Sequence, residues 1–116
     1  MKIGHLELFV RDPLASRDFY TKVLGFELIT VQDDQFVWLK KGDFEILLRP
    51  GANRGIADRY AESGAGIVLY TEDVPKTVAE LQGRGLLFDG CDGAANCPTF
   101  TDLDGHWFQV VNPRKA

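Results

Sequence analysis

The sequence predicts an α+β fold made of two tandem βαβββ modules, and three observations lead to this prediction. Two segments with alternating apolar and polar residues, typical of half-buried strands, begin near residues 5 and 66. Each is followed by an Asp suited to a helix N-cap and by a Pro in the first helical turn. Equivalent positions recur at a steady offset, since Asp12 and Asp73 lie 61 positions apart and Gly25 and Gly85 lie 60 apart. Two copies of one unit are therefore expected.

The first half is expected to contain one strand, one helix and three further strands. The helix starts at Asp12 and ends at Gly25, because glycine suits the left-handed end of a helix. Turn-forming residues at 33–34 and 41–43 separate the later strands, and Pro50 with Gly51 stops the last one. The expected strands are, in chain order, residues 5–12, 26–31, 36–40 and 44–48.

The second half repeats this order. A helix is expected after its cap Asp73, and Gly83 and Gly85 end it. A hairpin turn is expected at Asp102-Leu-Asp-Gly105. The expected strands are residues 66–72, 86–89, 99–101 and 107–111. The chain is thus expected to be a single domain over 1–116, with module 1 at about 1–50, a linker at 51–65 and module 2 at about 66–116.

Composition limits the function. The 116 residues are 45% hydrophobic, which suffices for one core, and the net charge of −4 with a pI of about 5.1 disfavours a nucleic-acid partner. No apolar run approaches the roughly 20 residues that span a membrane, and no signal peptide opens the chain, so a cytoplasmic protein is expected. The two cysteines, Cys91 and Cys97, are expected to be free thiols.

Two stretches carry a family resemblance. The opening, from Gly4-His5-Leu-Glu-Leu-Phe-Val-Arg-Asp12 to Phe19-Tyr20-Thr-Lys-Val-Leu-Gly25-Phe, resembles the glyoxalase/bleomycin resistance/dioxygenase, or vicinal oxygen chelate (VOC), superfamily. The close, Phe100-Thr-Asp-Leu-Asp-Gly105-His-Trp-Phe-Gln109-Val-Val, resembles it as well. The resemblance implies a curved, barrel-like mixed sheet with the helices outside, a concave cavity that binds a small molecule, and a homodimer that completes the site.

The resemblance also implies positions for a metal. Metal-dependent relatives place ligands on four strands, and the matching residues here are His5, Glu45, Gly66 and Gln109. Gly66 has no side chain, and Gln109 is a neutral donor, so the expected set is His5, Glu45 and Gln109. The cofactor is then one divalent ion (Zn, Ni, Mn, Fe or Mg) or none. A hydrogen-bonded structural role is the alternative for His5, and a solvated or Arg49-paired role is the alternative for Glu45.

Strand alternation selects the residues that line the cavity of such a fold. Because Phe44, Ile46 and Leu48 are expected to face the helix, their neighbours face inward. Glu7 needs a partner in this setting, which is Arg49, a metal or a ligand cation. His106 is expected at the surface, and the face of Trp38 stays open. The expected ligand-binding residues are Glu7, Phe9, Trp38, Leu47, Arg49, Val68, Tyr70 and Trp107.

Two functions fit these residues. The first is a binding protein, similar to bleomycin-resistance proteins, that sequesters a small molecule. The alternative is a metal-dependent lyase or isomerase of the glyoxalase type, in which Glu45 is the catalytic base and the metal stabilises an enediolate. A dioxygenase or a fosfomycin-type transferase is disfavoured, because His5 is the one inward His that the alternation provides. A non-catalytic role in regulation or partner contact is the third option.

Overall fold

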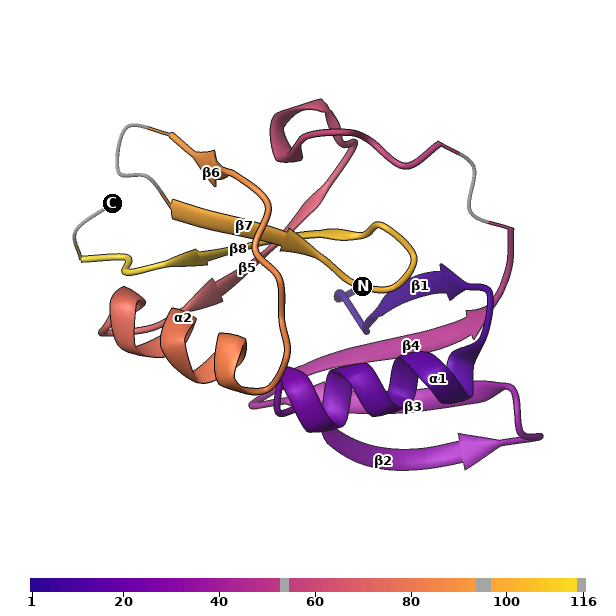
Figure 1. The fold of residues 1–116 in the computed structure, drawn as a ribbon. Helices are drawn as coiled ribbons and strands as arrows, with labels where there is room; N and C mark the ends of the chain where they lie inside the picture. Colours follow the sequence, from indigo (N-terminus) through magenta and orange to yellow (C-terminus); the bar gives the residue numbers. More distant parts are fainter. Residues whose placement is uncertain (53–54, 94–96, 115–116) are drawn as a thin grey trace. The chain divides into compact units, whose positions relative to one another are not determined.

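The computed structural model describes residues 1–52, 55–93 and 97–114. It divides into two compact units, Met1–Arg54 and Gly55–Ala116, and each is described by itself. Figure 1 shows that each unit holds one sheet and one α-helix. The α+β class and the repeated βαβββ order predicted from the sequence are confirmed. Residues 53–54 of the expected linker lie outside the described part.

The first unit follows the predicted order. Its elements are β1 (Leu6–Val10), α1 (Pro13–Asp18), a π-helical turn (Phe19–Val23), β2 (Glu27–Gln32), β3 (Phe36–Lys41) and β4 (Phe44–Pro50). The Asp12 side chain caps α1 by accepting a hydrogen bond from the backbone N–H of Ala15 at 3.2 Å. Gly25 ends the helical segment at a φ of +76°, which a residue with a side chain rarely adopts.

The first sheet has the strand order β1-β4-β3-β2, with β1 parallel to β4 and the other pairs antiparallel (Figure 1). Glu7 lies opposite Leu47, which in turn lies opposite Trp38. Helix α1 packs on β3 and β4 and covers one face of this sheet. Every second residue of β1, β3 and β4 points to that face. Its buried residues are Leu8, Val10, Val37, Leu39, Ile46 and Leu48. Burial of each such side chain stabilises the fold by roughly 1.5–3 kcal/mol.

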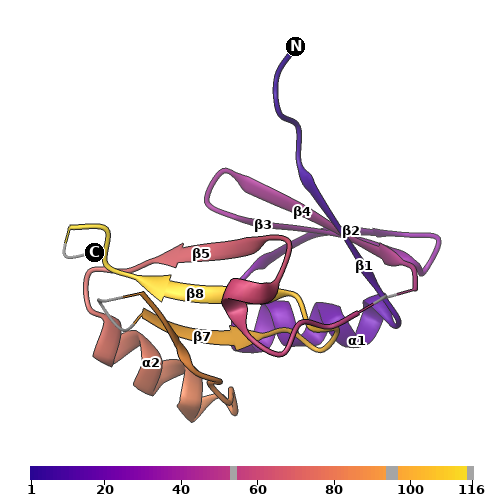
Figure 2. The same ribbon diagram turned by 90° about the horizontal axis from the view of Figure 1, so that it is seen from above.

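The second unit contains a 3₁₀ turn (Tyr60–Glu62), β5 (Gly66–Tyr70), α2 (Val74–Gly83), β6 (Cys91–Asp92), β7 (Cys97–Thr101) and β8 (Trp107–Val111). Its strand order is β5-β8-β7-β6, with β5 parallel to β8 (Figure 2). The Asp73 side chain caps α2 through the backbone N–H of Lys76 at 3.0 Å. Across the sheet, Val68 lies opposite Gln109, and Gln109 lies opposite Thr99.

Two details differ from the sequence prediction. The strand expected at 86–89 is wrong, because the short strand of this region is Cys91–Asp92. Leu86 is buried and Leu87 is 85% exposed, and the segment meets β7 at its end, where the backbone N–H of Asp89 donates to the carbonyl oxygen of Thr99 at 2.8 Å. Phe44, expected to face the helix with Ile46 and Leu48, is 47% exposed at the start of β4.

The two cysteines are free thiols, as expected. Cys91 lies opposite Pro98, and Cys97 lies opposite Asp92. Residues directly opposite each other share a face of a sheet, and neighbours along a strand point to opposite faces. The two thiols therefore point to opposite sides of the hairpin, which is incompatible with a disulfide between them.

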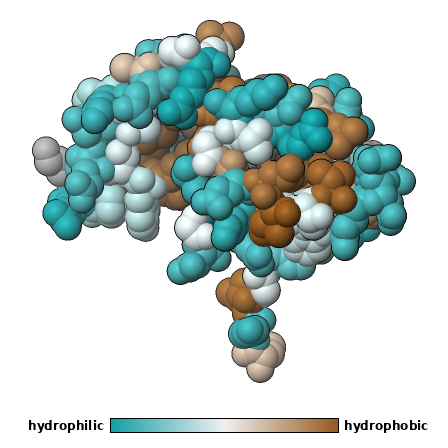
Figure 3. Space-filling view, turned by 90° about the horizontal axis from the view of Figure 1, so that it is seen from below, coloured by the Kyte–Doolittle hydropathy of each residue, from teal (hydrophilic) through white to brown (hydrophobic). Residues whose placement is uncertain are grey.

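The surface mixes polar and apolar areas. In the view of Figure 3, hydrophobic residues gather in one area between hydrophilic ones. The exposed large hydrophobic residues of the first unit include Leu28 and Ile29 on the edge strand β2. No helix in the described part of the chain is long and apolar enough to cross a membrane.

Candidate functional site

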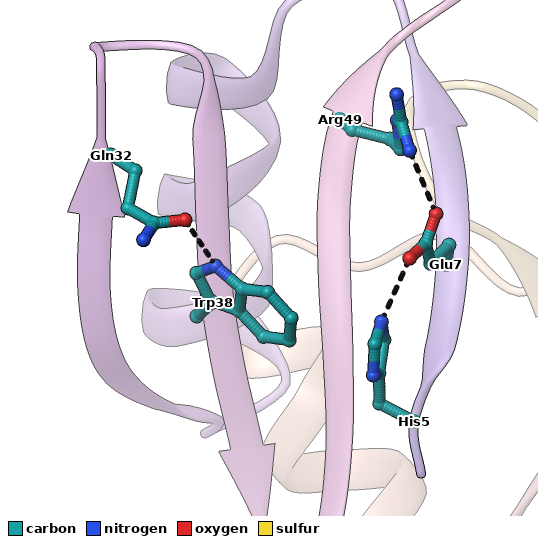
Figure 4. Close-up of polar contacts among 5 residues, drawn as sticks. All are labelled: His5, Glu7, Gln32, Trp38 and Arg49. Carbon is teal, nitrogen blue, oxygen red and sulfur yellow. Dashed lines mark hydrogen bonds and ion pairs between the residues drawn. The ribbon is translucent and has the colours of Figure 1, made fainter.

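The face of the first sheet opposite α1 carries a connected group of charged side chains (Figure 4). His5 precedes β1, Glu7 lies on β1 and Arg49 lies on the neighbouring strand β4. The Glu7 carboxylate accepts a hydrogen bond from His5 Nε2 at 2.8 Å and another from Arg49 Nη1 at 3.0 Å. Both residues are thus partners of Glu7, and one of them, Arg49, is the partner that the sequence suggested.

The charge of Glu7 is stabilised by these contacts. The hydrogen bond from His5, followed by the one from Arg49, holds the pKa of Glu7 below its ordinary value. The side chain is 35% exposed, so solvent screens the interaction with Arg49. At neutral pH the carboxylate is ionised and fixes the positions of an imidazole and a guanidinium on one open face.

Arg49 lies between two aromatic rings. Its guanidinium carbon is 5.2 Å from the ring centroid of Phe9 and 5.7 Å from that of Phe36. Its Nε is buried and has no hydrogen-bond partner within the described residues. A buried donor without a partner is costly, so an acceptor atom that reaches this N–H, once the side chains covering it move, would be stabilising.

Trp38 belongs to the same face. Its ring contacts the His5 ring edge-on, with centroids 4.7 Å apart, and its Nε1 donates to Gln32 Oε1 at 2.8 Å (Figure 4). The structure therefore assigns the face that the sequence left open for this residue. Leu47, opposite Trp38, is buried in the floor. We call this face of the first sheet, with Glu7, Phe9, Trp38, Leu47 and Arg49, the platform.

The residues at the metal positions of the family have other partners or no donor atom. His5 donates its Nε2 to Glu7, Gly66 provides no donor atom, and Gln109 donates its Nε2 to Tyr60 Oη at 2.9 Å. Glu45 is half-buried on β4, opposite Lys40. Across residues 1–52, 55–93 and 97–114, no three His, Cys, Asp or Glu side chains are grouped to hold a metal ion. Position 66 provides no donor, and His5 and Gln109 already have protein partners, so the chemistry of this set suits a divalent metal poorly.

The second unit contains a polar contact that sequence reasoning missed. Tyr60, on the 3₁₀ turn, reaches over the strands β5 and β8 to Gln109. Its ring contacts Trp107 edge-on at a centroid distance of 6.4 Å, and any side chain at Gly66 would collide with its hydroxyl. The glycine at position 66 is the signal that a bulky group lies there. Val68 and Tyr70, also expected in the site, are 42% and 74% exposed.

His106 also differs from the surface residue expected from the sequence. Its Nδ1 lies 2.8 Å from Oδ2 of Asp102, a carboxylate that is 1% exposed. Asp102 Oδ1 accepts from the backbone N–H groups of Asp104 and His106, each at 2.9 Å. Burial lowers the pKa of His106, but the hydrogen bond and charge of Asp102, with the charge of Asp104, outweigh it and raise the pKa. This contact stabilises the turn before β8.

A cavity of about 410 Å³ lies within the second unit, beside the Tyr60–Glu62 turn. Its wall carries one cation, Arg59, which is paired with Glu62 at 2.9 Å. The carboxylates that line it outnumber this cation, and they are Asp58, Glu62, Asp89 and Asp92. The local field therefore disfavours anions.

The family follows from comparison with known sequences. Residues 2–110 match the family described as the Glyoxalase/Bleomycin resistance protein/Dioxygenase superfamily. The chain belongs to this superfamily. No protein with a curated description matches it as a relative. As a VOC protein, it has the two βαβββ units that the opening and closing motifs led us to expect.

Solved structures of VOC proteins are similar along nearly the whole chain. The antibiotic-binding protein TnmS3 from a Streptomyces species is 27% identical, with a TM-score of 0.69, and the match covers 97% of this chain and 98% of that one. A lactoylglutathione lyase from Agrobacterium tumefaciens is 19% identical, with a TM-score of 0.72 and coverage of 97% and 94%. A fosfomycin resistance protein from Listeria monocytogenes is 15% identical, with a TM-score of 0.74 and coverage of 94% and 89%.

Proposed function

We propose that this VOC protein binds a flat, uncharged small molecule on the open face of the first sheet. The observation that carries the proposal is the His5–Glu7–Arg49 group set among Phe9, Phe36 and Trp38. Aromatic side chains with a few fixed polar groups are typical of small-molecule sites. The 27% identity to a protein described as antibiotic-binding supports this reading.

The chemistry of the group limits the ligand. Glu7 already neutralises Arg49, so a strongly anionic ligand gains little from this guanidinium. The unpartnered Nε of Arg49 favours a ligand with an acceptor such as a carbonyl oxygen. Phe9, 45% exposed, is available for contact with a ring.

A matched pair of probes tests the proposal. Coumarin is flat and carries a carbonyl acceptor, whereas naphthalene has a similar shape without one. We expect coumarin to shift the backbone resonances of β1 and β4 in a saturable way, and to bind about tenfold more tightly than naphthalene. Equal affinities would show that Arg49 contributes no recognition.

Two phenylalanines of similar exposure provide the control. Phe9 is 45% exposed and contacts Arg49. Phe44 is 47% exposed but lies on the other face of β4 from Glu45 and Arg49. Phe9→Ala should weaken coumarin binding several-fold, and Phe44→Ala should leave it unchanged. If both variants bind coumarin as the wild type does, the platform is not the site.

Lyase activity of the glyoxalase type, the alternative expected from the sequence, requires a metal that Glu45 and His5 would help to hold. Elemental analysis of the bound metal decides this alternative. The homodimer and the cytoplasmic location expected from the sequence remain predictions, and sedimentation analysis and cell fractionation test them.

A further inference from the structure

We infer that Gln32 is a positioning residue of the platform, because its hydrogen bond holds Trp38 in the orientation in which Trp38 supports His5. The inference rests on the binding function proposed above and deepens it, since it names a residue that acts on the ligand through other side chains. Gln32 ends the edge strand β2 and is not among the residues that the sequence predicted for the site.

The contact between Gln32 and Trp38 runs diagonally between two strands. Trp38 Nε1 donates to Gln32 Oε1 at 2.8 Å (Figure 4). Thr30 is the residue directly opposite Trp38, whereas Gln32 lies opposite Phe36, two positions further along β2. The indole ring has a single N–H donor, and Gln32 engages it. The bond therefore ties the ring to the neighbouring strand and restricts its rotation.

The backbone at Gln32 is itself held in place. The carbonyl oxygen of Gln32 accepts from the backbone N–H of Gln35 at 3.0 Å, which closes the turn between β2 and β3. Asp33 and Asp34, between them, have φ values of +53° and +54°, as a type I′ turn requires. A side chain on a fixed backbone loses less conformational entropy when it forms a hydrogen bond. Gln32 is thus a suitable anchor for the ring.

The other side of the Trp38 ring contacts His5. The two rings meet edge-on, with centroids 4.7 Å apart and an interplanar angle of 66°. His5 Nε2 donates to Glu7 at 2.8 Å, and Glu7 accepts from Arg49 at 3.0 Å (Figure 4). The pairing of β1 with β4 begins only at Leu6, so side-chain contacts hold the His5 ring. A continuous set of contacts therefore joins Gln32 to the charged group.

A purely structural role is the alternative for this hydrogen bond. Gln32 is exposed, and a hydrogen bond at the surface can stabilise a hairpin without affecting a binding site. In that case its loss would lower stability and leave ligand affinity unchanged. A positioning role predicts that loss of the acceptor releases the Trp38 ring, loosens His5 beside Glu7 and weakens ligand binding.

Two substitutions test the role of the acceptor in the full-length ¹⁵N-labelled protein. Gln32→Leu removes it, whereas Gln32→Glu keeps an oxygen that can accept. We expect the Trp38 indole N–H of Gln32→Leu to shift upfield and exchange faster with solvent, and coumarin to bind about fivefold more weakly. Gln32→Glu should restore both values. The indole N–H of Trp107, which donates to the carbonyl oxygen of Ala57 in the second unit, is the internal reference.

Gln35→Leu is the matched control, because Gln35 is an exposed glutamine of the same turn. It should leave the Trp38 resonance and coumarin affinity unchanged. An unchanged affinity in Gln32→Leu, or an equal loss in Gln32→Leu and Gln32→Glu, would overturn the inference and leave the binding function intact.

A wild type that does not bind coumarin would instead overturn the binding function. The pKa of Glu7 then decides the inference, because release of His5 removes the largest cause of its lowering. This pKa should be higher in Gln32→Leu than in Gln35→Leu. Equal values in the two variants would show that Gln32 does not position His5.

Discussion

The carboxylate of Glu7 lies 3.0 Å from the guanidinium of Arg49, a residue 42 positions away in the chain. The parallel pairing of β1 with β4 brings them together, because Glu7 and Arg49 lie on adjacent rungs of the same face. The contact joins the first and last strands of the first unit. The pKa of Glu7 therefore depends on whether these contacts are present.

The pKa of Glu7 should rise toward its ordinary value when either of its two partners is lost. His5→Ala and Arg49→Met should each raise it, because the hydrogen bond from His5 and then that from Arg49 are the largest causes of the lowering. NMR titration of the Glu7 side chain measures both effects. The pKa of Glu62, which Arg59 lowers in the second unit, should stay constant in both variants and is the internal control.

Gly66→Ala should destabilise the protein by about 1–3 kcal/mol, since the added methyl group forces Tyr60 out of its position. The free energy of unfolding in urea measures this change. Gly64→Ala is the matched control, because nothing lies close to position 64 and its φ is not in the left-handed region. A loss as large in Gly64→Ala would show that the effect does not come from the contact with Tyr60, since the chain entropy of glycine alone would make either substitution stabilising.

Stability should depend on pH through His106. Its pKa in the folded protein is raised above the ordinary value of 6.5, so the folded state binds the proton of His106 more tightly than the unfolded state does. The contribution is fully present below pH 6.5 and is lost as the pH rises through the folded pKa. Relative to His106→Gln, the wild type should therefore be more stable at pH 6 than at pH 8. A difference that does not change with pH would contradict the Asp102–His106 interaction.

Metal analysis should distinguish the two functions expected from the sequence. Protein purified without a His tag, incubated with nickel, zinc or manganese and then dialysed, should retain well below one ion per chain, because Gly66 has no donor atom and His5 and Gln109 already have protein partners. Elemental analysis gives the ratio. One ion per chain, lost in His5→Ala, would sink the binding-protein proposal and favour the lyase.

The regular elements were predictable because local chemistry determines them. Asp12 and Asp73 both cap helices, as their Asp-Pro context indicates, and the alternation of β1 and β4 places Glu7 and Arg49 on one face. The bounds of the strand expected at 86–89 could not be predicted, since alternation reports burial, whereas the pairing with β7 that defines a strand begins only at Asp89.

The remaining site contacts depend on tertiary structure. The turn that carries Tyr60 lies in a glycine-containing segment without periodicity, and its contact with Gln109 spans 49 positions. The partner of His106 is four residues away, but it is recognisable only once the turn has buried Asp102. Sequence alternation assigns a residue to a face, but it does not identify the group that covers that face.

The equivalent rungs of the two sheets have exchanged their chemistry. In the first sheet the parallel pair is Glu7 on β1 with Leu47 on β4, and in the second it is Val68 on β5 with Gln109 on β8. The polar residue thus lies on the first strand of one unit and on the last strand of the other. Two units with the same strand order thus present different polar groups, so a substitution can alter the chemistry of one sheet without removing the hydrogen bonds of the other.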